Sequence, residues 1–134
     1  MNQVLVDSNV LLDVLADDAQ WYEWSASQLE ACAETADLCI NPLVYAEVSV
    51  GFNRIEELED ALPASVFRGV PLPWDAGFLA GKTNLAYRSA KGTRSSPLPD
   101  FYIGAHAAIA GMTLLTRDAK RYQHHFPTLA LICP

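Results

Sequence analysis

No apolar run in this sequence approaches the roughly 20 residues that a membrane-spanning helix requires. The opening residues, MNQVLVDSN, have neither the basic segment nor the longer apolar stretch of a signal peptide. The three cysteines, Cys32, Cys39 and Cys133, lack the CxxC or Cys/His spacing of a zinc site. These absences argue against a membrane, secreted or zinc-stapled protein. We expect a single cytoplasmic domain, residues 1–134, with reduced and partly buried cysteines.

Basic residues are also few, with nine Lys and Arg against sixteen Asp and Glu and a net charge of −7. At first sight this balance argues against a nucleic-acid partner. The charges are unevenly distributed, however. Residues 1–75 carry −12 (fourteen acidic, two basic), whereas residues 76–134 carry +5 (two acidic, seven basic). Two faces with different partners would explain the asymmetry, and so would chance clustering on solvated helices.

The spacing of apolar residues predicts strands that alternate with helices. We expect short buried strands at 3–6, 38–40, 113–116 and 129–132, and an edge strand within 66–74, where two prolines interrupt hydrogen bonding. We expect helices at 8–16, 21–36, from 42 onward, 56–60, 75–89, 100–111 and 118–126, with a loop at 91–97. This order predicts an α/β fold with a mainly parallel sheet covered on both faces. The functional crevice of such a fold lies beyond the carboxyl ends of the strands.

Four acidic residues occupy positions that suggest chemistry. Asp7 and Asp118 each follow an apolar strand, Asp100 begins an Ala-rich helix, and Glu47 lies among valines in a helix. Each aspartate taken alone could simply cap a helix. Glu47 is harder to explain, because a carboxylate in an apolar stripe needs a partner, a metal ion or a helix face turned to water.

Taken together, the four acids predict a metal site. If the strands before Asp7 and Asp118 are neighbours, the two carboxylates converge, and gathered carboxylates need a cation to remain ionised together. Mg²⁺ and Mn²⁺ prefer carboxylate oxygens, and such ions promote in-line attack of water on phosphodiesters. The imidazoles of His106, His124 and His125 lie outside the four positions, so a zinc site is disfavoured.

Four segments of the chain resemble, in order, the motifs of the PIN-domain family. Val4–Val10 (VLVDSNV) is similar to the first motif, an Asp after a strand followed by Ser or Thr and Asn. Asn41–Glu47 (NPLVYAE) resembles the second, a helix that presents a Glu, and Pro99–Ala107 (PDFYIGAHA) the third, an Asp that opens an Ala-rich helix. Leu114–Asp118 (LLTRD) resembles the fourth. Together the matches span essentially the whole chain.

The resemblance implies a PIN-like three-layer α/β/α sandwich and an endoribonuclease that depends on Mg²⁺ or Mn²⁺. It implies Asp7, Glu47, Asp100 and Asp118 as the acidic set, with Asp7, Asp100 and Asp118 as the metal ligands. Asn9 and Thr116 match family positions that support the site. The compact size resembles the toxins of VapBC-like pairs, which implies an antitoxin that covers the active site and a homodimer. Many family members are more basic than this chain.

Basic residues close to the acidic motifs are candidates for binding RNA phosphates. They are Lys82, Arg88, Lys91 and Arg94 before Asp100, and Arg117, Lys120 and Arg121 around Asp118. Tyr87, Phe101 and Tyr102 could stack on the bases of single-stranded RNA, although core or surface packing explains each of them better when it is taken singly. For the antitoxin, we expect an apolar surface in the acidic half around Val10, Leu11, Trp21 and Trp24.

Two alternatives belong to other functional classes. A receiver-like module would use an Asp cluster to bind Mg²⁺ and accept a phosphoryl group. It needs a Lys on a late strand, but none lies near 129–132, and it gives Glu47 no role. A catalytically silent PIN domain could serve as a binding module, although the intact acidic set argues against it. A phosphatase with a DxD pair is disfavoured, because the second position here is Asn9.

Overall fold

The computed structural model describes residues 2–91 and 98–134, and the side chains of residues 90 and 91 also lie outside the description. The strands are β1 (Asn2–Val6), β2 (Ala36–Ile40), β3 (Phe67–Gly69), β4 (Thr113–Leu115) and β5 (Leu131–Ile132). The helices are α1 (Ser8–Leu15), α2 (Tyr22–Thr35), α3 (Pro42–Ser49), α4 (Ile55–Ala61), α5 (Trp74–Lys91), α6 (Leu98–Ala110) and α7 (Ala119–Gln123).

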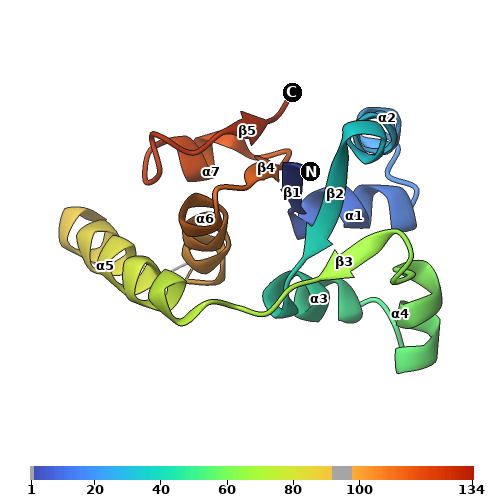
Figure 1. Ribbon diagram of the computed structural model, residues 1–134, viewed down its shortest axis with the longest axis horizontal. Helices are drawn as coiled ribbons and strands as arrows, with labels where there is room; N and C mark the ends of the chain where they lie inside the picture. The colour runs from blue at the N-terminus through green and yellow to red at the C-terminus, as the bar shows by residue number, and fades with distance from the viewer. Residues whose placement is uncertain (1, 92–97) are drawn as a thin grey trace.

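The five strands form one sheet in the order β3-β2-β1-β4-β5, and all four pairings are parallel. Helices flank the sheet on both sides (Figure 1), which gives the expected α/β/α sandwich. The chain moves outward in one direction from β1 to β2 and β3, and then crosses back to β4 on the other side of β1. The carboxyl ends of β1 and β4 therefore lie where the strand order reverses, which is the usual place for a site in such sheets.

The last three residues of the central strand β1 are fully buried. Val4, Leu5 and Val6 are buried in succession, as expected for a parallel strand with helices on both faces. Leu5 lies opposite Cys39 of β2, and Val6 lies opposite Leu115 of β4. The residue after Val6 is thereby placed beside the residue after Leu115, so the register brings two polar positions together at one edge of the sheet.

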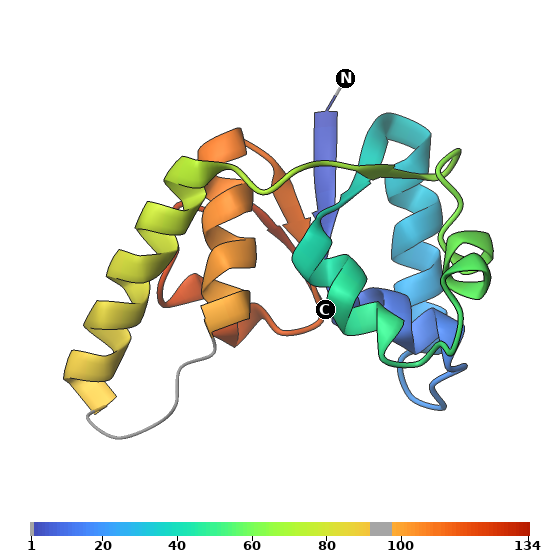
Figure 2. The same ribbon diagram turned by 90° about the horizontal axis from the view of Figure 1, so that it is seen from below.

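Helices α5 and α6 pack side by side at one end of the molecule (Figure 2). On its other side, α6 is held very close to the segment after α7. A Cβ atom on Gly104 would lie 2.5 Å from Cε2 of the buried Phe126 ring, so only glycine allows this approach. Because Asp100 begins the same helix one turn earlier, this contact helps to fix where Asp100 lies.

The elements follow the sequence-based predictions with small shifts at their ends. The proline-containing segment forms only the three-residue edge strand β3, as its composition predicted. Cys32 and Cys39 are buried and Cys133 is partly exposed, and all three are free thiols. Across the described residues, no helix is both long enough and apolar enough to span a membrane.

Candidate active site

Asp7 lies at the centre of a polar network at the carboxyl end of β1. Its side chain is 2% exposed, and its main-chain N–H donates to the Leu115 carbonyl (2.9 Å). Oδ1 accepts from the main-chain N–H of Ser8 (2.8 Å), so Asp7 does cap α1. Oδ2 accepts from the hydroxyls of Thr116 (2.8 Å) and Tyr122 (2.9 Å). Burial raises the pKa of Asp7, and these hydrogen bonds oppose the rise.

The loop after β4 is built around the same carboxylate. Thr116 is fully buried, and its Oγ1 accepts from the main-chain N–H of Asp118 at 3.0 Å while donating to Asp7. Asn9 bridges α1 to this loop, because its amide nitrogen lies 3.4 Å from both Asp7 Oδ2 and Thr116 Oγ1. Its amide oxygen accepts from the main-chain N–H of Arg117 (3.2 Å). Asn9 and Thr116 thus hold Asp7 and Asp118 in place relative to each other.

Glu47 reaches the crevice from α3. The helix begins at Asn41, whose side chain accepts from the Val44 N–H (2.9 Å), and Pro42 occupies the first helical turn. One carboxylate oxygen of Glu47 accepts from the Ser8 hydroxyl (2.9 Å), which directs Glu47 toward the start of α1 beside Asp7. Buried Val44 and Val48 take the core side of the helix, so Glu47 stands on the polar side.

Asp100, in the first turn of α6, completes the acidic set together with Arg121 of α7. The Arg121 guanidinium lies 3.1 Å from Asp100 and 3.2 Å from Asp118, and it joins the two carboxylates. The side chain of Asp100 is 15% exposed, whereas that of Asp118 is 39% exposed. Asp118 also caps α7 through the Arg121 N–H at 3.4 Å.

The pKa of Asp100 is affected by all three of the other acids in the set. Its pKa is raised to about 6, chiefly by burial, and the negative charges of Asp7, Glu47 and Asp118 raise it further. The positive charge of Arg121 opposes these effects without cancelling them. Carboxylates from β1, α3, α6 and the β4–α7 loop therefore lie close enough to repel one another.

The donor set fits a hard divalent cation, because it offers carboxylate and hydroxyl oxygens without thiolate or imidazole. Within residues 2–91 and 98–134, no three His, Cys, Asp or Glu side chains are grouped as a ready-made metal site. Arg121 instead provides positive charge between Asp100 and Asp118. The buried His106 takes no part, since its pKa is lowered by burial and its Nδ1 contacts the amide nitrogen of Asn41 at 3.1 Å.

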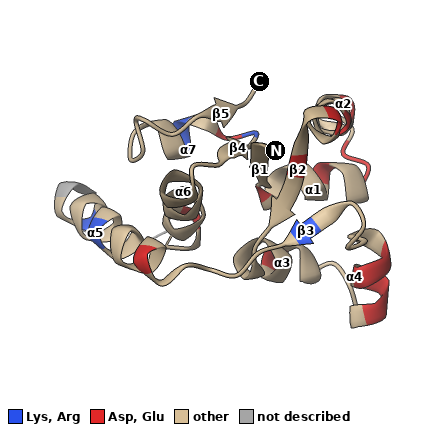
Figure 3. Cartoon of the chain, viewed as in Figure 1, with Lys and Arg blue, Asp and Glu red and all other residues tan. Residues whose placement is uncertain are grey.

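The basic candidates for RNA binding are placed differently from one another. Lys82 and Arg88 are exposed residues of α5, and the Lys82 ammonium lies over the Phe78 ring. Figure 3 shows basic colouring on α5, whereas α4 carries acidic colouring. The Lys91 side chain and Arg94 fall outside the described residues. Arg117 already has a partner within the chain, because its guanidinium forms an ion pair with the buried Asp13.

Other surface expectations require correction. Val10 and Leu11 are buried in the core and cannot form part of an antitoxin surface, whereas Trp21 and Trp24 are partly exposed. Phe101 is 1% exposed and packs edge-to-face on Tyr87, so it is not available to stack on a base. In each case the helical spacing of the apolar residues predicts that they face the core, and the structure agrees with the core position rather than with a surface role.

Sequence reasoning missed the roles that three residues play in building the site, although it named Arg121 as a candidate for binding RNA phosphates. The hydroxyls of Ser8 and Tyr122 hold Glu47 and Asp7, and Arg121 neutralises part of the acidic charge. Tyr122 could have been found from its spacing to Phe126, since residues four apart share one face of a helix. No pattern indicates that Arg121 turns inward, because a five-residue helix gives too little periodicity.

The sheet order and the acidic crevice at its reversal point define a known class of protein. Residues 4–126 match the model of the PIN domain, and the chain belongs to this family. No curated protein sequence matches the chain significantly.

Solved structures share the fold at low sequence identity. A chain of the DNA-bound VapBC2 complex from Rickettsia felis is similar with a TM-score of 0.72, 20% identity and 98% coverage of each chain. FitAcB from Neisseria gonorrhoeae is similar with a TM-score of 0.71 and 21% identity, and the match covers 96% of each chain. A chain of a toxin–antitoxin complex from Klebsiella pneumoniae is similar with a TM-score of 0.68 and 22% identity. The match covers 96% of this chain and 95% of the other. The expected PIN fold is thereby confirmed over essentially the whole chain.

Proposed function

We propose that this chain is a Mg²⁺- or Mn²⁺-dependent endoribonuclease that acts as the toxin of a toxin–antitoxin pair. The observation that carries the proposal is that Asp7, Glu47 and Asp118 all lie close enough to Asp100 for their negative charges to raise its pKa, which burial chiefly brings to about 6. Surplus negative charge of this kind is the usual electrostatic preparation for a divalent cation. The fold shared with toxin–antitoxin complexes supports the biological role.

In this proposal Asp7, Asp100 and Asp118 hold the metal, and Glu47 completes the acidic set from α3. When bound, such an ion activates water and neutralises the negative charge that develops on the phosphate oxygens. The hydroxyls of Thr116 and Tyr122 keep the Asp7 carboxylate in one orientation, and Ser8 does the same for Glu47. Because this network already holds the donors in place, little side-chain entropy remains to be lost when the cation binds.

Arg121 has a second use in the proposed reaction. It binds Asp100 and Asp118 in the structure, and its side chain is 44% exposed. Since a divalent cation competes for the same carboxylates, Arg121 can be freed to bind a phosphate of the RNA at the edge of the crevice. The proposal includes an antitoxin partner, a homodimer and a cytoplasmic site of action, where RNA and antitoxin are present.

The activity is tested with purified protein and RNA labelled at either end. We expect cleavage within the RNA in Mg²⁺ or Mn²⁺, and no cleavage in EDTA. A DNA strand of the same sequence serves to establish the substrate class. If the folded protein binds RNA and the metal but leaves the RNA intact, the chain is a catalytically silent PIN module. The family assignment removes the receiver-like alternative.

The proposed RNA surface includes the exposed cations of α5. Replacing Lys82 and Arg88 together with glutamine should weaken RNA binding and flatten its salt dependence. Each lost phosphate contact on a single strand lowers the slope of log K against log salt by about 0.7, so the double variant should lose about 1.4. Filter binding at several salt concentrations measures the slope.

The matched control replaces Arg54 and Arg68, which lie in the acidic half and pair with Glu56 and Asp37. This variant removes the same charge and should keep the slope of the wild type. Equal slopes for the α5 variant and the wild type would place the RNA on another surface.

A further inference from the structure

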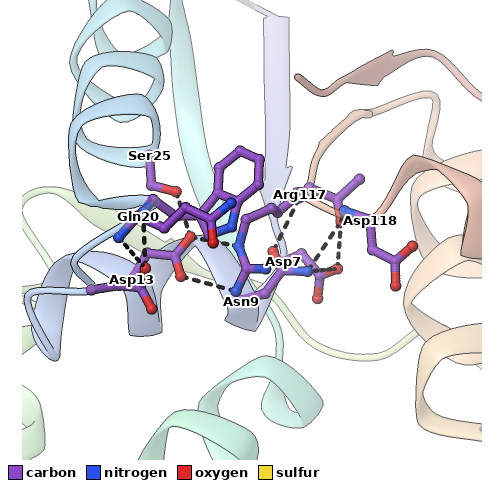
Figure 4. Close-up of polar contacts among 10 residues, drawn as sticks. Asp7, Asn9, Asp13, Gln20, Ser25, Arg117 and Asp118 are labelled. Carbon is purple, nitrogen blue, oxygen red and sulfur yellow. Dashed lines mark hydrogen bonds and ion pairs between the residues drawn. The ribbon is translucent and has the colours of Figure 1, made fainter.

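Asp13, an acidic residue of α1 that does not belong to the acidic set, is almost fully buried. Its side chain is 3% exposed. It accepts from Arg117 Nε (2.8 Å) and Nη2 (3.0 Å), and from the Ser25 hydroxyl (2.7 Å). A buried carboxylate is costly unless it is fully paired, so these three hydrogen bonds explain why it can be there. Figure 4 shows Asp13 and Arg117 facing each other across the gap between α1 and the β4–α7 loop.

The Arg117 guanidinium is held from a further direction. It lies over the Trp21 ring, with 5.3 Å from Cζ to the ring centroid, in the segment that leads into α2. Two N–H groups that donate to one carboxylate fix the orientation of the guanidinium plane. An aromatic ring beside the guanidinium restricts its rotation further. Three segments distant in sequence therefore meet at one arginine: α1, the start of α2 and the β4–α7 loop.

The position of Arg117 in the chain gives this network its functional meaning. Arg117 stands between Thr116, which donates to Asp7, and Asp118, which belongs to the acidic set. Its main-chain N–H donates to Asn9 Oδ1 (3.2 Å), so the same residue is tied to α1 through both its backbone and its side chain. With Arg117 drawn toward Asp13, the side chains of Thr116 and Asp118 are left to face the crevice.

We propose that the ion pair between Asp13 and Arg117 is a positioning device for Thr116 and Asp118. This inference rests on the proposed metal-dependent function. It assigns Arg117 to the support of the loop rather than to RNA phosphates. The pair touches no reacting group and acts only through the backbone of residues 116–118.

The proposal is tested with Asp13→Asn, Arg117→Gln and the milder Arg117→Lys, which keeps the charge but loses the two-pronged geometry. Mn²⁺ affinity is measured by calorimetry on folded protein, well below each melting temperature. Loss of a group that holds a metal ligand in place typically costs 10–100-fold in affinity. We expect losses in this range for Asp13→Asn and Arg117→Gln, and a smaller loss for Arg117→Lys. The KM for RNA should change little while kcat falls.

The control is Asp37→Asn, which breaks the exposed ion pair with Arg68 on β2 and β3. It should leave Mn²⁺ affinity unchanged. If Asp13→Asn lowers only the melting temperature and binds Mn²⁺ like the wild type, the pair is purely structural and the proposal is overturned. If Arg117→Gln raises KM and flattens the salt dependence with normal Mn²⁺ affinity, Arg117 is an RNA contact and the proposal is likewise overturned.

Amide hydrogen exchange separates this proposal from the proposed function. In Asp13→Asn the N–H groups of Arg117 and Asp118, which donate to Asn9 and Thr116, should exchange faster than in the wild type. This readout needs no metal. If the wild-type protein fails to bind Mn²⁺, the proposed function is wrong. If these two amides exchange at the same rate in Asp13→Asn as in the wild type, the positioning role is wrong.

Discussion

Replacing Asp7 with asparagine is expected to reduce RNA cleavage by more than about 100-fold. Mutating a residue that only supports a metal ligand already lowers metal affinity or activity by up to about 100-fold, and Asp7 is proposed to be a ligand itself. The amide removes a charged oxygen donor at the centre of the site. It also presents an NH₂ group to the hydroxyls of Thr116 and Tyr122, which donate to Asp7 Oδ2 in the wild type. Single-turnover cleavage rates and Mn²⁺ affinity, measured on folded protein, give the result.

The matched control is Asp60→Asn, which makes the same chemical change at an exposed position of α4. It should cleave RNA at the wild-type rate. If Asp7→Asn is folded and fully active, Asp7 is only the cap of α1 and the metal site lies elsewhere. Circular dichroism and thermal melts establish that the variant is folded before activities are compared.

Replacing Asp100 with asparagine should have opposite effects on activity and on stability. Activity should fall by more than about 100-fold for the reason given for Asp7. Without metal, however, the fold should become more stable at pH 8, because ionised Asp100 is partly buried and repelled by Asp7, Glu47 and Asp118. A site optimised for function at the expense of stability behaves in this way.

The pH dependence follows from the direction of the Asp100 shift. Its pKa in the folded protein is about 6, above the ordinary value of 3.8, so the native state binds more protons than the unfolded state between these pH values. The contribution of Asp100 to the stability of the metal-free wild type therefore falls as pH rises from about 4 to about 6 and then levels off. The stability gained by Asp100→Asn should grow over the same window to about 1–3 kcal/mol, at about 1.4 kcal/mol for each pKa unit.

Thermal melts in EDTA across this pH range measure the effect. Mn²⁺ at one hundred times its dissociation constant should add about 2.7 kcal/mol to the wild type at pH 8 and far less to the variant. A variant that melts lower than the wild type in EDTA at pH 8, together with no effect of Mn²⁺ on the wild type, would identify Asp100 as a simple structural acid.

The sequence was sufficient to predict the fold and to indicate which acids converge. Parallel strands end at one edge of a sheet, so an Asp after the first strand and a Thr-x-Asp after the fourth had to be close if those strands were neighbours. The structure confirms this neighbourhood, since Val6 lies opposite Leu115.

What the sequence could not supply was the direction of individual polar side chains in short segments. Residues 116–118 form a loop without periodicity, and nothing in their order indicates that Arg117 turns away from the crevice. Arg121 belongs to a helix of five residues, in which the inner face is set by tertiary contacts. Asp13 lies on a helix whose polar positions predict exposure to solvent, and its burial depends on partners elsewhere in the chain, Arg117 and Ser25.

The length of chain between bonded partners has a consequence for biosynthesis. Thr116 and Tyr122, which hold the Asp7 carboxylate, follow it by 109 and 115 positions. A ribosome adds about 5–20 residues per second, so Asp7 leaves it several seconds or more before its partners exist. The nascent chain can build α1, α2 and the pairing of β1 with β2 early, but its acidic crevice cannot assemble until residues 113–122 have emerged. Under the proposed function, the nascent chain therefore cannot cleave RNA before these residues have left the ribosome.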